Sequence, residues 1–130
     1  MAGMVISEVA RRAGLRPSTL RYYEQVGILP PPERASGQRR YDAGVLGRLA
    51  VISRARQTGF TLDEIKQLFF GFRDDIAASD RWRRLSVRKI DELEASIERM
   101  AAMQRLLRRM QKNCRCKTLD QCGKALLGHE

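Results

Sequence analysis

All three cysteines of this 130-residue chain lie within nine residues, at Cys114, Cys116 and Cys122. Thiolate sulfurs bind soft metal ions tightly, and so short a loop brings them together at small entropic cost. Positive charge nearby favours the thiolate form of a cysteine, and the same segment supplies it from Arg115, Lys117 and Lys124. The sequence therefore predicts a metal or redox site in this loop.

Three thiols do not complete the four-ligand site that zinc prefers. A site shared across a dimer, a contribution from His129, or an ion of low coordination number would compensate for the missing ligand. Two plainer alternatives remain. A zinc ion or a disulfide could merely tie the loop down, or only two cysteines could be active, with Cys122 buried on the apolar side of a short helix beside Leu119 and Leu126.

A long helix without Gly or Pro is predicted directly before the cysteines, from Ser79 to about Lys112. Ser79 is the expected N-cap, and Asp80 places negative charge where the helix dipole favours it. Such a helix would run about 50 Å at 1.5 Å per residue, which is longer than so small a domain can cover. An apolar stripe follows it in steps of three and four, through Ile90, Leu93, Ile97, Met100 and Leu107, widened by Met103, Leu106 and Met110. We therefore expect a coiled-coil homodimer, the alternative being a helix that lies across its own domain.

A helix-turn-helix is predicted over residues 6–29. Gly14 lies between two helical segments, and Pro17 opens the second, where proline is tolerated in the first turn. Because Leu20 and Tyr23 face inward, the polar side chains of the second helix face outward, as in helices that enter the major groove. A packed corner of two helices with a solvated second helix is the alternative. The side chains predicted to lie in the groove are Arg16, Ser18, Thr19, Arg21 and Tyr22.

A basic β-hairpin is predicted next, around the turn Ser36-Gly37. The three prolines at 30–32 are expected to stop the preceding helix, because each fixes φ and lacks a donor. Arginines on both arms would form a cationic wing beside the second helix, since forked guanidinium groups match phosphate oxygens. The predicted phosphate contacts are Arg34, Arg39, Arg40 and Tyr41, with Arg56 of the following helix.

A second helical pair completes the N-terminal domain. The first helix spans Ala43–Gln57, ends at Gly59, and carries Val45, Leu46, Leu49, Ile52 and Ser53 on one side. Thr61 and Glu64 form a capping box for the second, and Trp82 is expected to anchor packing. The predicted fold is mostly α, with a winged helix-turn-helix DNA-binding domain at 1–76, a dimerisation helix at 77–112, and a cysteine-containing sensing loop and tail at 113–130.

The net charge of +10 and the isoelectric point near 10.4 indicate a partner rich in negative charge. Nucleic acid fits this balance, and an anionic membrane surface is the alternative. There is no apolar run of about 18 residues that could span a bilayer and no signal-peptide pattern. We therefore expect a cytoplasmic protein with reduced cysteines. The sole histidine is His129 and no glycine-rich phosphate loop occurs, so we do not expect an enzyme.

The chain resembles the MerR family of bacterial transcription regulators over essentially its whole length. The resemblance is carried by ISEVARRAGLRPSTLRYYEQVGILPPPER, GQRRYD, RARQTGFTLDEIKQL and the long helix with its cysteine loop. It implies an antiparallel dimerising coiled coil with an effector site near its end. It also implies that the dimer sits on promoter DNA whose two polymerase elements are too far apart, and distorts that DNA for RNA polymerase. Gln38 departs from the family pattern, which usually has an aromatic residue after the glycine of the hairpin.

Within that family, Cys114 and Cys122 are similar to the cysteine pair of the copper-responsive branch. Ser79 stands at the helix-start position where that branch also has serine, whereas the mercury, zinc and lead branches have cysteine. The three-cysteine spacing with Trp82 is similar to the iron–sulfur redox branch, but Gln111 replaces a further cysteine of that branch. The resemblance favours sensing of a soft metal ion, Cu(I) or else Zn or Hg. Thiol or electrophile sensing, an iron–sulfur cluster and a non-sensing nucleic-acid-binding adaptor are the alternatives.

Overall fold

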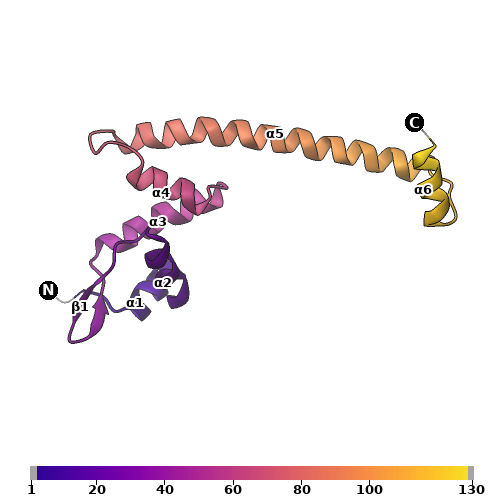
Figure 1. The fold of residues 1–130 in the computed structure, drawn as a ribbon. Coiled ribbons are helices and arrows are strands. Elements are labelled where there is room, and N and C mark those ends of the chain that lie inside the picture. The colour runs from indigo at the N-terminus through magenta and orange to yellow at the C-terminus, as the bar shows by residue number, and fades with distance from the viewer. Residues whose placement is uncertain (1–2, 129–130) are drawn as a thin grey trace. The chain divides into compact units, whose positions relative to one another are not determined.

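The computed structural model describes residues 3–128, which form helices and one small β-hairpin (Figure 1). Two compact units divide the chain, one up to Lys89 and one from Ile90 onward. We call them the first and second units. The first unit extends beyond residue 76, where we expected the DNA-binding domain to end, because the first turns of the long helix pack into its core.

The helix-turn-helix consists of α1, Ile6–Ala13, and α2, Pro17–Val26. Gly14 follows α1 in the left-handed conformation at φ 69°, as predicted for the turn. The end of α2 differs from the prediction: Gly27, at φ 88°, ends the helix before the prolines are reached. The backbone N–H of Gly27 donates to carbonyls of the last turn, so the glycine cap satisfies the helix end without help from the proline run.

The predicted hairpin is present, with β1, Glu33–Ala35, paired antiparallel to β2, Gln38–Arg40. Its two turn residues, Ser36-Gly37, have φ values of 52° and 79°. A two-residue turn with both φ values positive matches the right-handed twist of the strands it joins. A bridge of two backbone hydrogen bonds, 2.8 and 2.9 Å long, ties Tyr41 at the end of the hairpin to Met4 at the start of the chain.

The second helical pair consists of α3, Gly44–Gln57, and α4, Leu62–Phe70. Ser53 is exposed and Ala55 is buried, so our placement of Ser53 on the inward side was wrong. The inward side of α3 instead follows steps of four, three and three from Val45 through Leu49, Ile52 and Ala55. Gly59 directly follows the cap residue Thr58 in the left-handed conformation at φ 88°, as predicted for the glycine that ends this helix.

The capping box that begins α4 is confirmed. The backbone N–H of Glu64 donates to the Thr61 hydroxyl at 3.2 Å, and the Thr61 N–H donates to Glu64 Oε1 at 2.8 Å. The Glu64 carboxylate also lies 2.8 Å from Nζ of Lys89, which is buried on the long helix. The same side chain therefore caps α4 and ties it to the next helix.

The long helix α5 spans Ala78–Asn113 and so begins one residue before Ser79. Ser79 lies inside the first turn and is not the N-cap that we predicted, because the N–H groups of Asp80 and Arg81 already donate to the carbonyl of Ala77. The predicted packing role of Trp82 is confirmed: its ring meets Phe60 edge-on, with 6.0 Å between the ring centroids.

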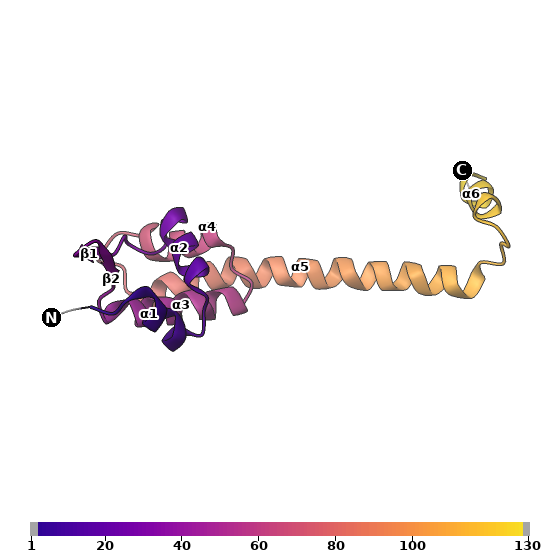
Figure 2. The ribbon, with the colours of Figure 1, turned by 90° about the horizontal axis from the view of Figure 1, so that it is seen from below.

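The core of the first unit gathers α1–α4 and the first turns of α5 (Figure 2). The Arg81 guanidinium closes the loop between α4 and α5 by donating to the carbonyls of Phe69, Arg73 and Ile76 at 3.0–3.1 Å. The largest fully buried side chains come from all four of the helices α1–α4 and from the segment that follows α2. They are Val9, Leu20, Ile28, Leu29, Ile52 and Ile65.

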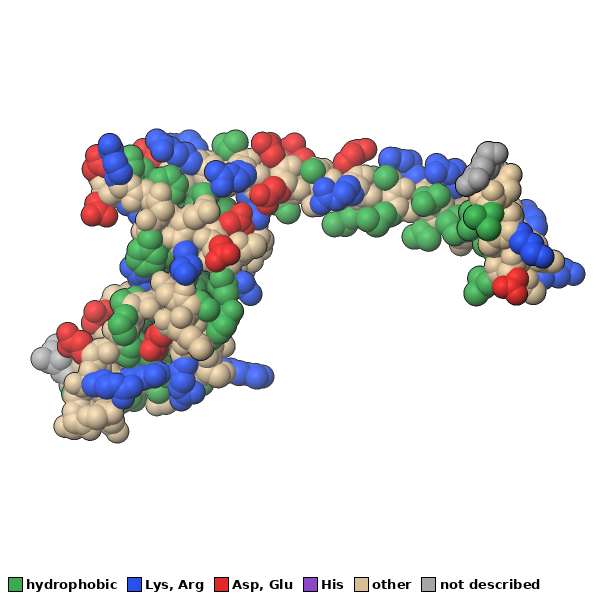
Figure 3. Space-filling view, in the orientation of Figure 1, with side chains coloured by type: hydrophobic (Ala, Val, Ile, Leu, Met, Phe, Trp, Pro, Cys, Tyr) green, Lys and Arg blue, Asp and Glu red, His purple; other side chains and the backbone are tan. Residues whose placement is uncertain are grey.

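The second unit contains the rest of α5 and the short helix α6, Leu119–Leu127. The apolar stripe predicted on α5 is uncovered, with 45–65% of each side chain exposed from Ile90 to Met110. Figure 3 shows hydrophobic side chains gathered along one side of this part of the helix. None of the helices within residues 3–128 is long and apolar enough to cross a membrane.

Candidate nucleic-acid interface and cysteine site

The outward face of α2 carries the side chains predicted to enter a DNA groove. Arg16 precedes the helix in extended backbone, and Ser18, Arg21 and Tyr22 are exposed on its first two turns. Thr19 is half-buried beside them. Leu20 and Tyr23, on the opposite side, are buried as predicted. The core therefore fixes which side of α2 is available to a ligand.

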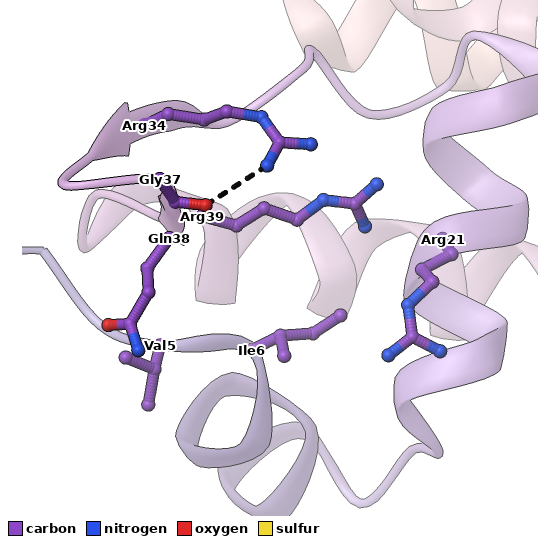
Figure 4. Close-up of a pocket in the computed structure, with 7 residues that line it drawn as sticks. All are labelled: Val5, Ile6, Arg21, Arg34, Gly37, Gln38 and Arg39. Atoms are coloured by element: carbon purple, nitrogen blue, oxygen red, sulfur yellow. Dashed lines mark hydrogen bonds between the residues drawn. The ribbon is translucent and has the colours of Figure 1, made fainter.

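A shallow cavity of about 300 Å³ lies between α2 and the hairpin, next to the start of α1. Figure 4 shows that Arg34 and Arg39 reach from the two strands toward α2, from which Arg21 reaches back. Arg34 also donates to the carbonyl of Gly37 at 3.3 Å, across the hairpin turn. Three guanidinium groups from three elements thus converge on a space large enough for a phosphate group.

Tyr41, which we predicted as a phosphate contact, lies in the core and not on the exposed surface of the hairpin. Only 3% of it is exposed, and its hydroxyl donates to the carboxylate of Glu24 on α2. Burial, and then the hydrogen bond to Glu24, raises the pKa of Tyr41 to about 12. The interpretation of Tyr41 as a phosphate contact was wrong, because the ring belongs to the core beneath the hairpin and the hydroxyl is already bonded.

Glu24 is a residue that the sequence reasoning missed. One of its carboxylate oxygens lies 3.7 Å from Arg39 on β2, and the carboxylate accepts the Tyr41 hydrogen bond. It therefore links the second helix of the helix-turn-helix to both the hairpin and the core. The available signal was a single acidic residue in an otherwise neutral or basic helix.

The remaining predicted phosphate contacts differ in exposure. Arg40 is half-buried, and its guanidinium donates to the carbonyl of Gly3 at 3.4 Å and to Gln38 at 3.2 Å. Arg34 and Arg56 are exposed, the latter in the last turn of α3. Within residues 3–128, Arg39 and Arg40 each have one buried side-chain nitrogen without a hydrogen-bond partner. The nitrogen of Arg39 still lies near the Glu24 carboxylate.

The three cysteines are brought together at the junction of α5 and α6. Their sulfur atoms all lie within 4.8 Å of one another. Cys114 directly follows α5, with its N–H donating to Met110 at 3.0 Å, and Cys122 lies on α6. Thr118 caps α6 by accepting from the N–H of Gln121. Two helix ends therefore hold the outer two cysteines close together.

The cysteine sulfurs are accessible and interact with one another. Cys114 and Cys116 are exposed and Cys122 is half-buried. The pKa of Cys114 is lowered, first because the backbone N–H of Cys116 donates to its sulfur and then because the Cys116 thiol does so. The same thiol hydrogen bond raises the pKa of Cys116. Cys114 is therefore the sulfur best prepared to be a thiolate.

The alternative of a Cys122 buried on an apolar helix face does not fit this chain. Leu119, on the predicted apolar side of α6, is 88% exposed, and Leu126 is 64% exposed. No residue of α6 is buried. Nothing within one chain's described residues covers that face of the helix.

The sulfur cluster fits a soft metal ion. Sulfurs that bind one ion at about 2.3 Å lie at most about 4.6 Å from one another, so the observed spacing needs little adjustment. In residues 3–128 the group contains these three cysteines and no fourth His, Asp or Glu. Ser79 is exposed in the first turn of α5 and is not part of it, and His129 lies outside the described residues.

Comparison with known proteins gives concordant matches. Residues 4–70 match the model of the MerR HTH family regulatory proteins, and residues 46–110 match the model described as MerR, DNA binding. The chain is 36% identical over 120 residues to an uncharacterised HTH-type transcriptional regulator of Pseudomonas aeruginosa, an alignment that covers 92% of this chain and 91% of that protein.

Two further matches concern proteins linked to metals, one by its name and one by the ion in its solved structure. The mercuric resistance operon regulatory protein of Bacillus cereus is 34% identical over 111 residues, covering 84% of this chain and 83% of that one. The solved structure of the transcription regulator PbrR691 from Ralstonia metallidurans CH34, in complex with lead(II), is similar with a TM-score of 0.76 and 32% identity. That similarity covers 88% of this chain and 91% of the other.

Proposed function

The chain belongs to the MerR family of transcription regulators, which are not enzymes, and on that premise we propose that it is a metal-responsive member of the family. As a homodimer it binds promoter DNA, senses a soft metal ion through Cys114, Cys116 and Cys122, and switches transcription by distorting the bound DNA for RNA polymerase. The observation that carries the sensing part is the convergence of three sulfurs within 4.8 Å.

DNA binding rests on the exposed face of α2 and on the arginines around it. The side chains at the start of α2 read base edges in the major groove, while the hairpin arginines hold phosphates and set the orientation. Figure 3 shows Lys and Arg side chains gathered across the part of the first unit that carries the hairpin. Arg34, Arg39 and Arg21 around one cavity are the strongest support for a bound phosphate.

The support for a homodimer is the uncovered apolar stripe of α5. Exposed contiguous apolar surface on a helix is stabilised by a second helix, and a second copy of the same chain presents the matching stripe. In an antiparallel pair, the start of one α5, where Ser79 lies, is beside the end of the other. Paired subunits then present two copies of α2 to an inverted repeat of half-sites.

Metal sensing rests on the thiol chemistry of the loop and on the metals named for two relatives. A soft ion exchanges the thiol protons for metal–sulfur bonds and ties the end of α5 to α6. The ion would favour one of two dimer shapes, and the DNA held by both subunits follows that shape. The ion can shift the balance between the two dimer shapes only by the difference between its binding free energies for them.

The test is transcription in vitro from a promoter that the protein binds, with reduced protein and added Cu(I), Zn(II) or Hg(II). We expect at least one ion to change transcript yield several-fold while DNA occupancy, followed by fluorescence anisotropy, changes little. Cys114→Ser should remove the response and leave DNA affinity within about twofold of wild type. Metal-independent transcription by wild type and Cys114→Ser alike would exclude the sensing function and leave DNA binding standing.

A second candidate, thiol oxidation, is favoured by the exposure of Cys114 and its lowered pKa. An added disulfide oxidant would take two electrons and two protons from a pair of these thiols and form one sulfur–sulfur bond. Under metal-free conditions, a response to that oxidant which dithiothreitol reverses would select this function. The cluster lacks a fourth thiol within residues 3–128, so an iron–sulfur centre has no comparable support.

A further inference from the structure

We propose that Cys116 completes a three-thiolate site within each chain, and that this site takes a soft ion of charge two or three in preference to Cu(I). The inference rests on the proposed metal-sensing function and narrows it to a class of ion. With Cys116 as the third ligand, the site needs no ligand from the start of α5.

The geometry of the loop is the first support. Cys116 lies between two fixed points, the end of α5 at Cys114 and the cap of α6 at Thr118. The loop is held further by the N–H of Lys117, which donates to the Gln121 side chain at 2.9 Å. The sulfur of Cys116 lies within 4.8 Å of the sulfurs of both Cys114 and Cys122. Its side chain therefore points into the cluster although the loop is exposed to solvent.

The number of sulfurs is the second support. Two thiolates are sufficient for an ion of low coordination number, so a site built for Cu(I) would not need the third sulfur. All three sulfur–sulfur separations are within 4.8 Å, so one ion can reach the three of them together. Zinc would need a fourth ligand to complete its usual set, and no fourth side chain of residues 3–128 belongs to the group.

The charge balance is the third support. Three thiolates leave a charge of −2 around a monovalent ion, −1 around a divalent ion and none around a trivalent ion. The loop is exposed, and Arg115, the residue between the first two cysteines, acts on Cys114 as a nearby positive charge. The positive side chains of this segment, Arg115, Lys117 and Lys124, have one negative charge to balance around a divalent ion and two around a monovalent ion. The complex of a divalent ion is therefore the more easily neutralised of the two. Ions such as lead(II), mercury(II) and arsenic(III) have the required charge and affinity for sulfur.

The experiment compares two probes on the full-length, reduced protein under anaerobic conditions. Lead(II) is the three-sulfur probe and Cu(I) the two-sulfur probe, and each is titrated into wild type and Cys116→Ser in competition with a chelator. X-ray absorption at the lead edge counts the sulfurs around the ion. For wild type we expect one lead ion per chain with three sulfurs.

In Cys116→Ser we expect two sulfurs and a loss of lead affinity of at least about tenfold, since even indirect metal partners are worth that much. Cu(I) affinity should change by less than about threefold. Ser79→Ala is the matched control and should leave both affinities and the sulfur count unchanged. Because Cys116 is exposed, the variant should fold, which its circular dichroism and DNA affinity check.

Equal lead affinity in wild type and Cys116→Ser would overturn the three-thiolate site, as would a wild-type sulfur count of two. Metal sensing itself would then still stand, without Cys116 as a ligand, if Cu(I) altered transcription through Cys114 and Cys122. A lead affinity that falls in Ser79→Ala would also overturn the inference, since the site would then depend on the start of α5. Failure of both ions to bind wild type would instead remove the metal-sensing proposal itself.

Discussion

The two units of this chain position their functional side chains in different ways. In the first unit, buried residues such as Leu20 and Ile52 fix the outward face of α2 and the hairpin beside it. In the second unit no residue of α6 is buried, and the cysteines are placed by helix caps and a short loop. The surface that we propose to read DNA is therefore complete within one chain, whereas the apolar surfaces of the second unit are uncovered in a single chain.

The largest effect should come from the core of the first unit. Leu20 on α2 is fully buried, so Leu20→Ala should lower the free energy of unfolding by about 2–5 kcal/mol through reduced burial and the cavity left behind. Urea denaturation followed by circular dichroism measures it. Gln25→Ala, on the exposed side of the same helix, should stay within about 0.5 kcal/mol. Equal losses in both variants would show that the core does not set the orientation of α2.

The next effect should come from the uncovered stripe of the second unit. Ile97 is 65% exposed in the single chain, so Ile97→Glu should leave the first unit folded but prevent pairing, because it places a charge between the helices. Without the linked second half-site, binding to an inverted repeat should weaken by about 100-fold or more. Sedimentation velocity and fluorescence anisotropy measure both properties.

Glu94→Gln, an exposed polar position of the same helix, is the matched control and should remain a dimer. If Ile97→Glu also remained dimeric with full DNA affinity, the stripe would not be the dimer contact, and the contrast between the units would lose its explanation.

The sequence predicted the helix-turn-helix, the hairpin turn and the capping box because each depends on local residue chemistry. Gly14, Ser36-Gly37 and Thr61 with Glu64 adopt the conformations that their own types favour. The end of α2 was misplaced since a glycine cap and a proline run compete there, and the cap comes first. Helix-start errors of one residue, as at Ser79, arise because several residues can serve as caps.

Long-range contacts could not be predicted in the same way. Tyr41 and Glu24 are far apart in sequence, and only the packed hairpin shows that the tyrosine hydroxyl is bonded within the core. The sulfur cluster is an intermediate case. Its spacing indicated a site, but whether Cys116 faced the other two sulfurs depended on loop backbone that residue types alone do not determine.

A smaller effect should follow from removing one guanidinium that we propose to hold a phosphate. Arg34→Ala should weaken binding to all duplex sequences alike, by several-fold, because a guanidinium on phosphate carries no base information. The slope of log affinity against log salt should become shallower by about 0.9 for each phosphate that the protein no longer neutralises. Binding isotherms at several salt concentrations measure this, and Arg73→Ala, exposed but outside the hairpin region, is the control. A weakening confined to one sequence would instead make Arg34 a base-reading residue.

The smallest effect concerns the link between hairpin and core at high pH. Burial and the Glu24 bond raise the pKa of Tyr41 from 10.0 to about 12, so between pH 10 and 12 the folded chain retains a proton that the unfolded chain loses. Stability from this group is therefore complete below pH 10 and falls as the pH rises toward 12, by about 1 kcal/mol at pH 11.

Tyr41→Phe should remove that part of the alkaline loss, because phenylalanine has no proton to release in either state. Tyr22→Phe, on the exposed side of α2, should keep the wild-type dependence. Urea midpoints at pH 8, 10 and 11 compare the three proteins. If Tyr41→Phe lost stability as steeply as wild type, the hydroxyl of Tyr41 would not contribute to the core, and its exclusion from the DNA surface would need another cause.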